Sequence, residues 1–95
     1  MNITDIKVRR LFDEGNVKAL VSITLDNEFA IHELKVIEGR TRMFVSMPNR
    51  RDSDGGFLDI AHPMTRDVRL ILEKKVLEVY YESLEKKMKR VQNVG

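Results

Sequence analysis

Residues Val17–Leu25 read VKALVSITL, and this stretch decides the fold of the chain. Its odd-numbered positions are all apolar, whereas its even-numbered positions include Lys18, Ser22 and Thr24. Successive side chains of a β-strand point to opposite faces, so an apolar residue at every second position indicates a strand with one buried face. The stretch is therefore predicted to be a strand, and the residues on either side of it predict its neighbours.

The flanking segments predict an antiparallel sheet. Residues 3–12 alternate in a similar way, and Asp13-Glu14-Gly15-Asn16 supplies turn chemistry that joins them to Val17–Leu25 as a hairpin. Three further strands are predicted over residues 28–37, 43–47 and 57–61. Within the first of these, the parity of the apolar positions changes near His32-Glu33, which indicates either a β-bulge or a strand covered on both faces.

A helical segment is predicted over residues 64–90, after Pro63 ends the sheet. Thr65 can cap this helix by accepting hydrogen bonds from the backbone N–H groups of the first turn. One apolar stripe at i, i+3, i+4 spacing suits packing on a sheet face; it consists of Val68, Ile71, Leu72, Val76 and Val79. The predicted fold class is therefore α+β: an antiparallel meander of about five strands over residues 1–62, followed by a C-terminal helical segment.

A second apolar stripe lies on nearly the opposite side of the helix and consists of Leu70, Leu77, Tyr81, Leu84 and Met88. Two explanations stay open. The helix can break near Tyr81-Glu82 and fold back, or the stripe can contact another subunit. We favour an oligomer contact through Leu77, Tyr81 and Leu84, because no interior proline or glycine marks a break.

Length and composition limit the possible classes of protein. The 95 residues suffice for a single domain with one core, and the absence of cysteine excludes a disulfide framework and a thiolate nucleophile. No apolar run approaches the length of a membrane span, and the first residues lead directly into a strand pattern. We therefore expect a cytoplasmic protein with no membrane partner.

Paired arginines are the candidate binding residues. The net charge is only +2, so the positions of the basic residues matter more than their sum. Arg50 and Arg51 stand in the polar connection between two predicted strands, and Arg66 and Arg69 stand at the start of the helix. A guanidinium group offers a planar fork of donors to a phosphate, and a helix N-terminus also favours an anion. The alternative is that nearby acids such as Asp52 already neutralise these arginines in solution.

The sequence offers little for catalysis. Both histidines, His32 and His62, come from separate predicted strands without the spacing of a metal site, so a hydrogen-bonded structural role is the expectation for each. Gly55-Gly56 lies between strands and matches neither a phosphate-binding loop nor a dinucleotide fingerprint. We expect no catalytic residue, no metal, no cofactor and no small-molecule substrate.

A family resemblance covers about the first two-thirds of the chain. Its specific core is Phe44-Val45-Ser46-Met47-Pro48, then Arg51, Asp54-Gly55, Phe57, Asp59-Ile60 and His62-Pro63. This combination closely resembles the SpoVG family of bacterial sporulation and septation regulators. The resemblance implies a small dimeric α+β protein that binds DNA, and in some members RNA, and that regulates gene expression and cell division.

The chain departs from the family pattern in its loop and in its tail. Asp52, Ser53 and Gly56 make the loop less basic and less rigid than the proline-containing loop common in the family, and the C-terminal end is basic where many members are acidic. The leading hypothesis is a dimeric nucleic-acid-binding regulator that uses Arg50, Arg51, Arg66 and Arg69. The alternative is a protein-interaction adaptor that acts through its sheet edge or its C-terminal helix.

Overall fold

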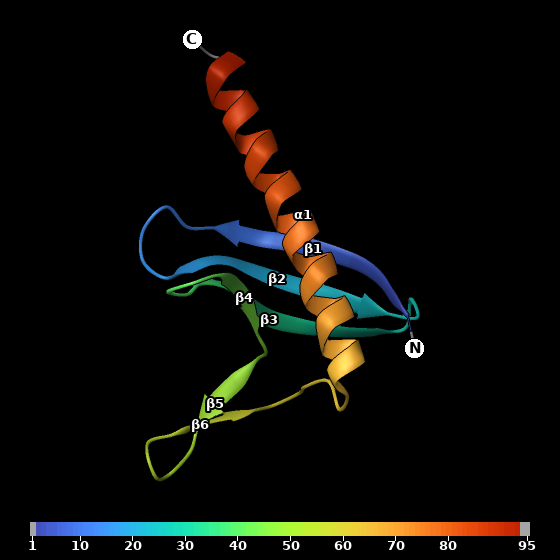
Figure 1. Ribbon diagram of the computed structural model, residues 1–95. Helices are drawn as coiled ribbons and strands as arrows, with labels where there is room; N and C mark the ends of the chain where they lie inside the picture. Colours follow the sequence, from blue (N-terminus) through green and yellow to red (C-terminus); the bar gives the residue numbers. More distant parts are fainter. Residues whose placement is uncertain (1, 94–95) are drawn as a thin grey trace.

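The computed structural model describes the backbone of residues 2–93 and the side chains of residues 2–89. It confirms the predicted α+β class, with a sheet followed by one long C-terminal helix (Figure 1). The elements in chain order are β1 (Ile3–Leu11), β2 (Val17–Leu25), β3 (Phe29–Glu38), β4 (Met43–Ser46), β5 (Asn49–Arg51), β6 (Phe57–Asp59) and α1 (Arg66–Asn93).

The main sheet is an antiparallel meander in the order β1-β2-β3-β4. Strand β2 pairs on both sides, with Ile23 opposite Ile6 of β1 and opposite Ile31 of β3. The predicted parity change in β3 is a β-bulge, because the register shifts between Val21 and Ile23 and Glu33 has a positive φ of 66°. The bulge returns the apolar side chains of β3 to the buried face of the sheet.

The meander has four strands instead of the predicted number of about five, because the fifth predicted strand does not extend it. Residues Phe57–Asp59 instead pair with Asn49–Arg51 in a separate two-stranded sheet, with Arg50 opposite Leu58. A tight turn closes the hairpin, in which the backbone N–H of Asp52 donates to the carbonyl of Gly56 at 2.9 Å. The arginine pair, which the sequence placed in a loop, is therefore part of a strand.

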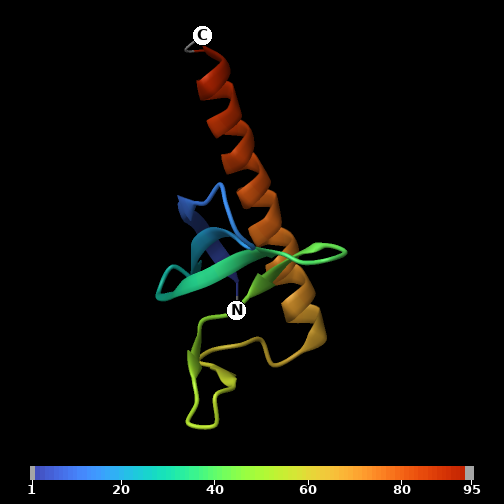
Figure 2. The same cartoon turned by 90° about the vertical axis from the view of Figure 1, so that its left-hand side faces the viewer.

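Helix α1 runs without a break, so the fold-back alternative near Tyr81 is wrong. The predicted cap is confirmed, because the hydroxyl oxygen of Thr65 accepts a hydrogen bond from the backbone N–H of Val68 at 3.2 Å. Figures 1 and 2 show the C-terminal half of the helix extending beyond the sheet.

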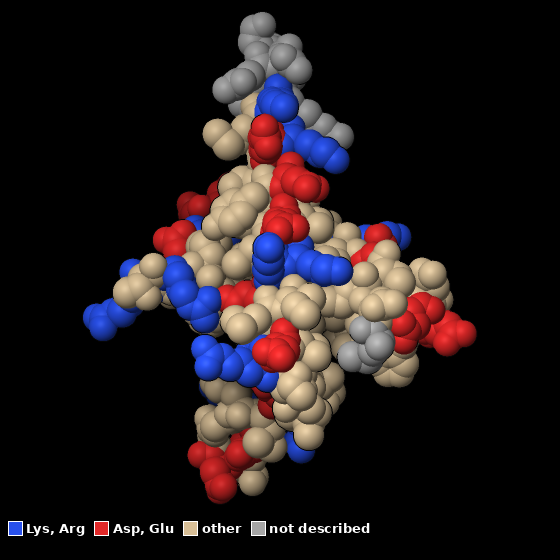
Figure 3. Space-filling model, turned by 45° about the vertical axis from the view of Figure 1, so that its right-hand side comes forward, with Lys and Arg blue, Asp and Glu red and all other residues tan. Residues whose placement is uncertain are grey.

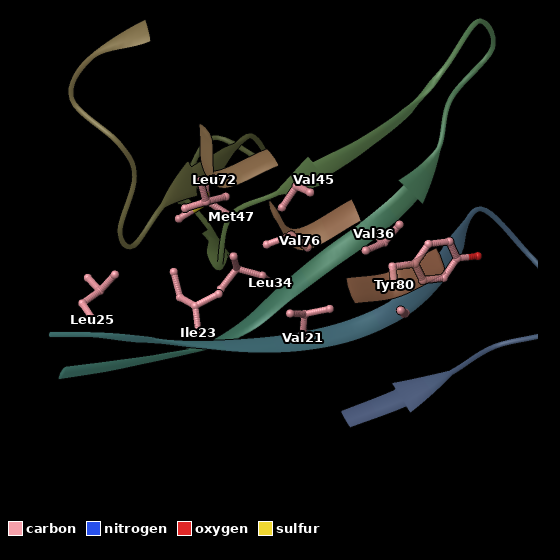
Figure 4. Close-up of a cluster of buried hydrophobic side chains, with 11 residues drawn as sticks. Val21, Ile23, Leu25, Leu34, Val36, Val45, Met47, Leu72, Val76 and Tyr80 are labelled. Carbon is pink, nitrogen blue, oxygen red and sulfur yellow. The ribbon is translucent and has the colours of Figure 1, made fainter. Parts of the chain in front are cut away.

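The core lies between α1 and one face of the meander. Figure 4 shows Leu72, Val76 and Tyr80 of the helix over side chains of β2, β3 and β4. Val76 is fully buried at the centre of this contact. Figure 2 shows that the helix covers only one face of the sheet, so the other face carries the polar positions of the strands.

Candidate nucleic-acid interface

The β5–β6 hairpin carries Arg50 and Arg51 away from the body of the molecule (Figures 1 and 2). Both side chains are exposed, and the alternation of strand β5 directs them to opposite faces of the hairpin. The guanidinium carbon of Arg51 lies 5.6 Å from the ring centroid of Phe57, its cross-strand partner. This cation–π contact orients Arg51 while its N–H donors stay available to solvent.

The acids next to Arg50 and Arg51 in the sequence do not neutralise them through ion pairs. Within residues 2–89, neither arginine has a carboxylate oxygen within 4.0 Å. The carboxylate of Asp52 instead accepts a hydrogen bond from the backbone N–H of Asp54 and so stabilises the turn. The hairpin therefore presents two guanidinium groups whose donors can bind an oxyanion.

Arg66 and Arg69 lie in the first turn and a half of α1, and both are exposed. Glu73 follows Arg69 by four residues in the sequence, one turn along the helix. In the structure, Glu73 pairs with Arg42 of the β3–β4 turn, and only Asp67 provides an acid in the first turn. Arginines next to the positive end of a helix dipole are locally unfavourable, and a bound anion would relieve this.

The four candidate arginines lie at the same end of the molecule, since a short segment joins the hairpin to the start of α1 (Figure 1). They are not part of a uniformly basic surface. Figure 3 shows cationic and anionic side chains interspersed along the helix and around the sheet. The pattern fits local patches, as the pairing of basic residues in the sequence predicts.

Part of the second apolar stripe on α1, which the sequence suggested as an oligomer contact, packs within the same chain. Leu77 and Leu84 are half-buried and pack against the core, whereas Tyr81 is 50% exposed. The ring of Tyr81 lies 5.2 Å from that of Tyr80 in a tilted arrangement. Of this stripe, Leu70, Tyr81 and Met88 remain available for an external contact.

Sequence reasoning missed a polar cluster on the uncovered face of the sheet. Ser22 is only 6% exposed, and its hydroxyl lies 3.2 Å from Nε of Arg9 and 2.8 Å from Nδ1 of His32. Arg9 donates to the Ser22 oxygen, and the hydroxyl of Ser22 shares a second hydrogen bond with the imidazole of His32. The cluster could have been found, because Ser22 interrupts the apolar centre of β2 and Arg9 and His32 belong to the two strands beside it.

The two histidines have separate hydrogen bonds rather than a common ligand. Nδ1 of His62 lies 3.0 Å from the carbonyl oxygen of Pro63 at the junction between hairpin and helix, in line with the hydrogen-bonded structural role that the sequence predicts. Among residues 2–93, no three His, Asp or Glu side chains gather as metal ligands would. Over the same residues, α1 lacks the apolar composition that crossing a membrane would need.

The fold and the site define a class: a small α+β domain that presents an arginine-bearing hairpin beside the start of a long helix. The model of the SpoVG family matches residues 1–82. The chain therefore belongs to the SpoVG family.

Individual relatives agree with this family over most of their length. A protein of Caldanaerobacter subterraneus subsp. tengcongensis, named a septation protein SpoVG, is 52% identical over 85 residues, which cover 90% of this chain and 93% of the relative. A protein of Clostridioides difficile with the same name is 50% identical over 84 residues, covering 88% and 91%. One from Exiguobacterium sibiricum is 52% identical over 80 residues, covering 84% and 78%.

Proposed function

We propose that this chain is a nucleic-acid-binding regulator that acts on gene expression and septation in bacteria. DNA is the proposed partner, with RNA as a further one, and the working form is a cytoplasmic homodimer without enzymatic activity. The septation role is supported by the names of the relatives.

The proposal rests on the exposure of the two hairpin arginines and on how they are paired. Arg50 and Arg51 are exposed on a projecting element and have no carboxylate partner within residues 2–89. A protruding β-ribbon can reach a groove or a phosphate backbone that the flat sheet cannot. Arg66 and Arg69 add donors at the same end of the molecule.

The test is a binding titration with a fluorescent DNA duplex, and with a matched RNA, over several salt concentrations. Each phosphate contact releases counterions, so the affinity should fall steeply as salt rises. In the Arg50→Ala/Arg51→Ala variant the slope of log K against log salt should decrease by about two per chain. A matched control is Lys86→Ala/Lys89→Ala, which removes the same charge from the other end of the helix. If the arginine variant binds as tightly as wild type at matched salt, the site assignment is wrong.

The alternative function is a protein-interaction adaptor. The observation that favours it is the exposed apolar surface of α1, where Leu70 and Met88 are more than half exposed. An adaptor predicts weak retardation of DNA that does not depend on sequence and that the Arg50→Ala/Arg51→Ala variant leaves unchanged. The salt titration therefore separates the two functions.

A further inference from the structure

Ser22 lies at the centre of a donor-rich cluster on the face of the meander that α1 leaves uncovered (Figure 2). Its neighbours Val21 and Ile23 belong to the core, so the alternation of β2 turns the Ser22 side chain away from the helix. Ser22 is nevertheless only 6% exposed. Side chains next to it on the sheet therefore surround it, and two of them, Arg9 and His32, are bonded to its hydroxyl.

An irregularity of the sheet flanks Ser22 on each side. In β1 the register shifts around Arg9, which is left without a residue opposite it. In β3 two residues, His32 and Glu33, occupy the place opposite Ser22. Glu33 has a φ of 66°, in the left-handed region that residues with a Cβ rarely adopt. Bulges re-aim single side chains and are frequent next to functional sites, and here both bring a polar side chain to the same hydroxyl.

The bonds to Ser22 orient two donor groups and leave their outer nitrogens free. Arg9 uses Nε, 3.2 Å from the hydroxyl oxygen, so the two terminal nitrogens of its guanidinium group remain. His32 uses Nδ1, at 2.8 Å, so Nε2 remains. Within residues 2–89, neither side chain has a carboxylate oxygen within 4.0 Å, and the carboxylate of Glu33 pairs with no cation. The cluster therefore has unused donors and no anion of its own.

Two lysines extend the positive charge of this face. Lys7 stands directly opposite Ser22 in the register of β1 and β2, so the two side chains lie on the same face. Lys35 stands opposite Leu20, in the next row. Neither lysine has an ion pair among residues 2–89. On β1 the nearest acid of this face is Asp5, in the row on the other side of Ser22. The charge around Ser22 therefore complements an anion.

We infer that Arg9 and His32, held in place by Ser22, form a binding site for a phosphate group on the uncovered face of the sheet. The planar fork of the guanidinium group matches two phosphate oxygens, and an imidazole that carries its proton on Nε2 donates to a third. Lys7 and Lys35 border the site and add charge. Ser22 is a positioning residue, because its hydroxyl fixes both donors before the phosphate arrives and so lowers the entropy lost on binding.

The site is separate from the one in the proposed function, because none of its residues belongs to the β5–β6 hairpin or to the start of α1. The phosphate group can be part of a small phosphorylated ligand or of a nucleic-acid backbone. Both sources present the same oxyanion to Arg9 and His32, and the experiments below distinguish them.

The first experiment titrates the protein with inorganic phosphate at constant ionic strength and follows the backbone amide signals by NMR. The amides of Arg9, Ser22 and His32 should shift with one common dissociation constant. Arg9→Lys keeps the charge but loses the planar fork and the Nε bond, so phosphate should bind at least about tenfold more weakly. Arg10→Lys is the matched control, since Arg10 is exposed on the same strand and its guanidinium carbon lies 4.9 Å from the ring centroid of Phe12. It should bind phosphate as the wild type does.

Ser22→Ala gives a sharper test because it removes no charge. Independent surface charges would bind phosphate equally well without the hydroxyl, whereas an organised site should lose about fivefold in affinity when Arg9 and His32 are no longer held. Circular dichroism verifies that the variant folds, and the exposed position of Arg9 keeps Arg9→Lys decisive if it does not. Wild-type affinity in Arg9→Lys or in folded Ser22→Ala, or equal losses in Arg9→Lys and Arg10→Lys, would overturn the inference.

Two further probes identify the source of the phosphate. A nucleoside 5′-monophosphate and a DNA duplex are titrated at matched ionic strength, and the one that carries the phosphate should shift the amides of Arg9 and Ser22 and bind Arg9→Lys more weakly. Shifts with neither probe would contradict the site. The Arg50→Ala/Arg51→Ala variant should bind inorganic phosphate on the sheet as tightly as the wild type, and a loss there would assign the phosphate to the hairpin instead. Failure of the hairpin as a nucleic-acid site and failure of this site therefore appear in different measurements.

Discussion

The ion pair between Arg42 and Glu73 should hold α1 in place on the meander. Arg42 belongs to the β3–β4 turn, which is closed by a hydrogen bond from the backbone N–H of Gly39 to its carbonyl at 2.9 Å. Its guanidinium group donates to the carboxylate of Glu73, a buried residue of the helix. The pair therefore links the turn to the part of α1 that packs on the core.

The expected magnitude follows from the unequal burial of the two side chains. Glu73 is 12% exposed in its side chain and Arg42 is 66% exposed. Exposed pairs are worth about 0–1 kcal/mol, whereas removing one partner of a fully buried pair costs roughly 3–5 kcal/mol. With one side of the pair in solvent, Arg42→Met should lower the free energy of unfolding by about 2 kcal/mol. In a domain of this size that corresponds to roughly 8–15 °C in Tm.

The assay is urea unfolding followed by circular dichroism at a fixed protein concentration. Arg40→Met is the matched control, because Arg40 lies in the same turn and is exposed without an ion pair among residues 2–89. Glu73→Gln and the double variant complete a cycle whose coupling free energy should be about 1–2 kcal/mol. The reasoning is refuted if Arg42→Met costs no more than Arg40→Met, or if the coupling is zero within error.

Two further predictions concern the sheet and the helix. Ser22→Ala should lower the free energy of unfolding by about 1 kcal/mol, because a buried hydroxyl loses two hydrogen bonds while the exposed Arg9 and His32 regain water; an unchanged urea midpoint would contradict this. Burial, and then the charges of a neighbouring tyrosinate and carboxylate, raise the pKa of Tyr80 above its usual 10.0. Folding therefore favours the neutral phenol. The stability that this phenol contributes is complete below pH 10 and is lost as the pH rises through the higher pKa of the folded state. Tyr80→Phe should flatten the decline of stability above pH 10, and equal declines in the two proteins would exclude a role for this phenol.

The main sheet and the helix could be predicted because their residues repeat a simple pattern over many positions. The alternation in Val17–Leu25 fixes which face is buried. The parity change near Glu33 locates the irregularity in β3, and the structure decides for the bulge over a strand covered on both faces. Thr65 similarly marks the start of α1, because a side-chain acceptor is needed where backbone N–H groups lack helical partners. These features are local, so the sequence contains them directly.

Only half of the hairpin could be predicted: β6 lies within the strand predicted over residues 57–61, whereas β5 is too short and too polar for a period to be recognised. Asn49–Arg51 contains no apolar residue, and its extended form depends on pairing with Phe57–Asp59 across the turn that begins at Asp52. The partners of charged side chains are equally non-local. Asp52 is adjacent to Arg51 yet bonds the turn backbone, and Glu73 pairs with Arg42 from 31 residues away.

The position of the arginines on a weakly supported element has a thermodynamic consequence. The hairpin depends on its own ladder and on the turn at Asp52, and the apolar side chains Leu58 and Ile60 are exposed in the single chain. Such an element opens at a low free-energy cost, so it presents Arg51 in one orientation only part of the time. Nucleic acid that binds Arg51 has to meet that cost, so changes that stabilise the hairpin should strengthen binding. Because linkage is reciprocal, bound nucleic acid should in turn stabilise the hairpin by the same factor by which an ordered hairpin strengthens nucleic-acid binding.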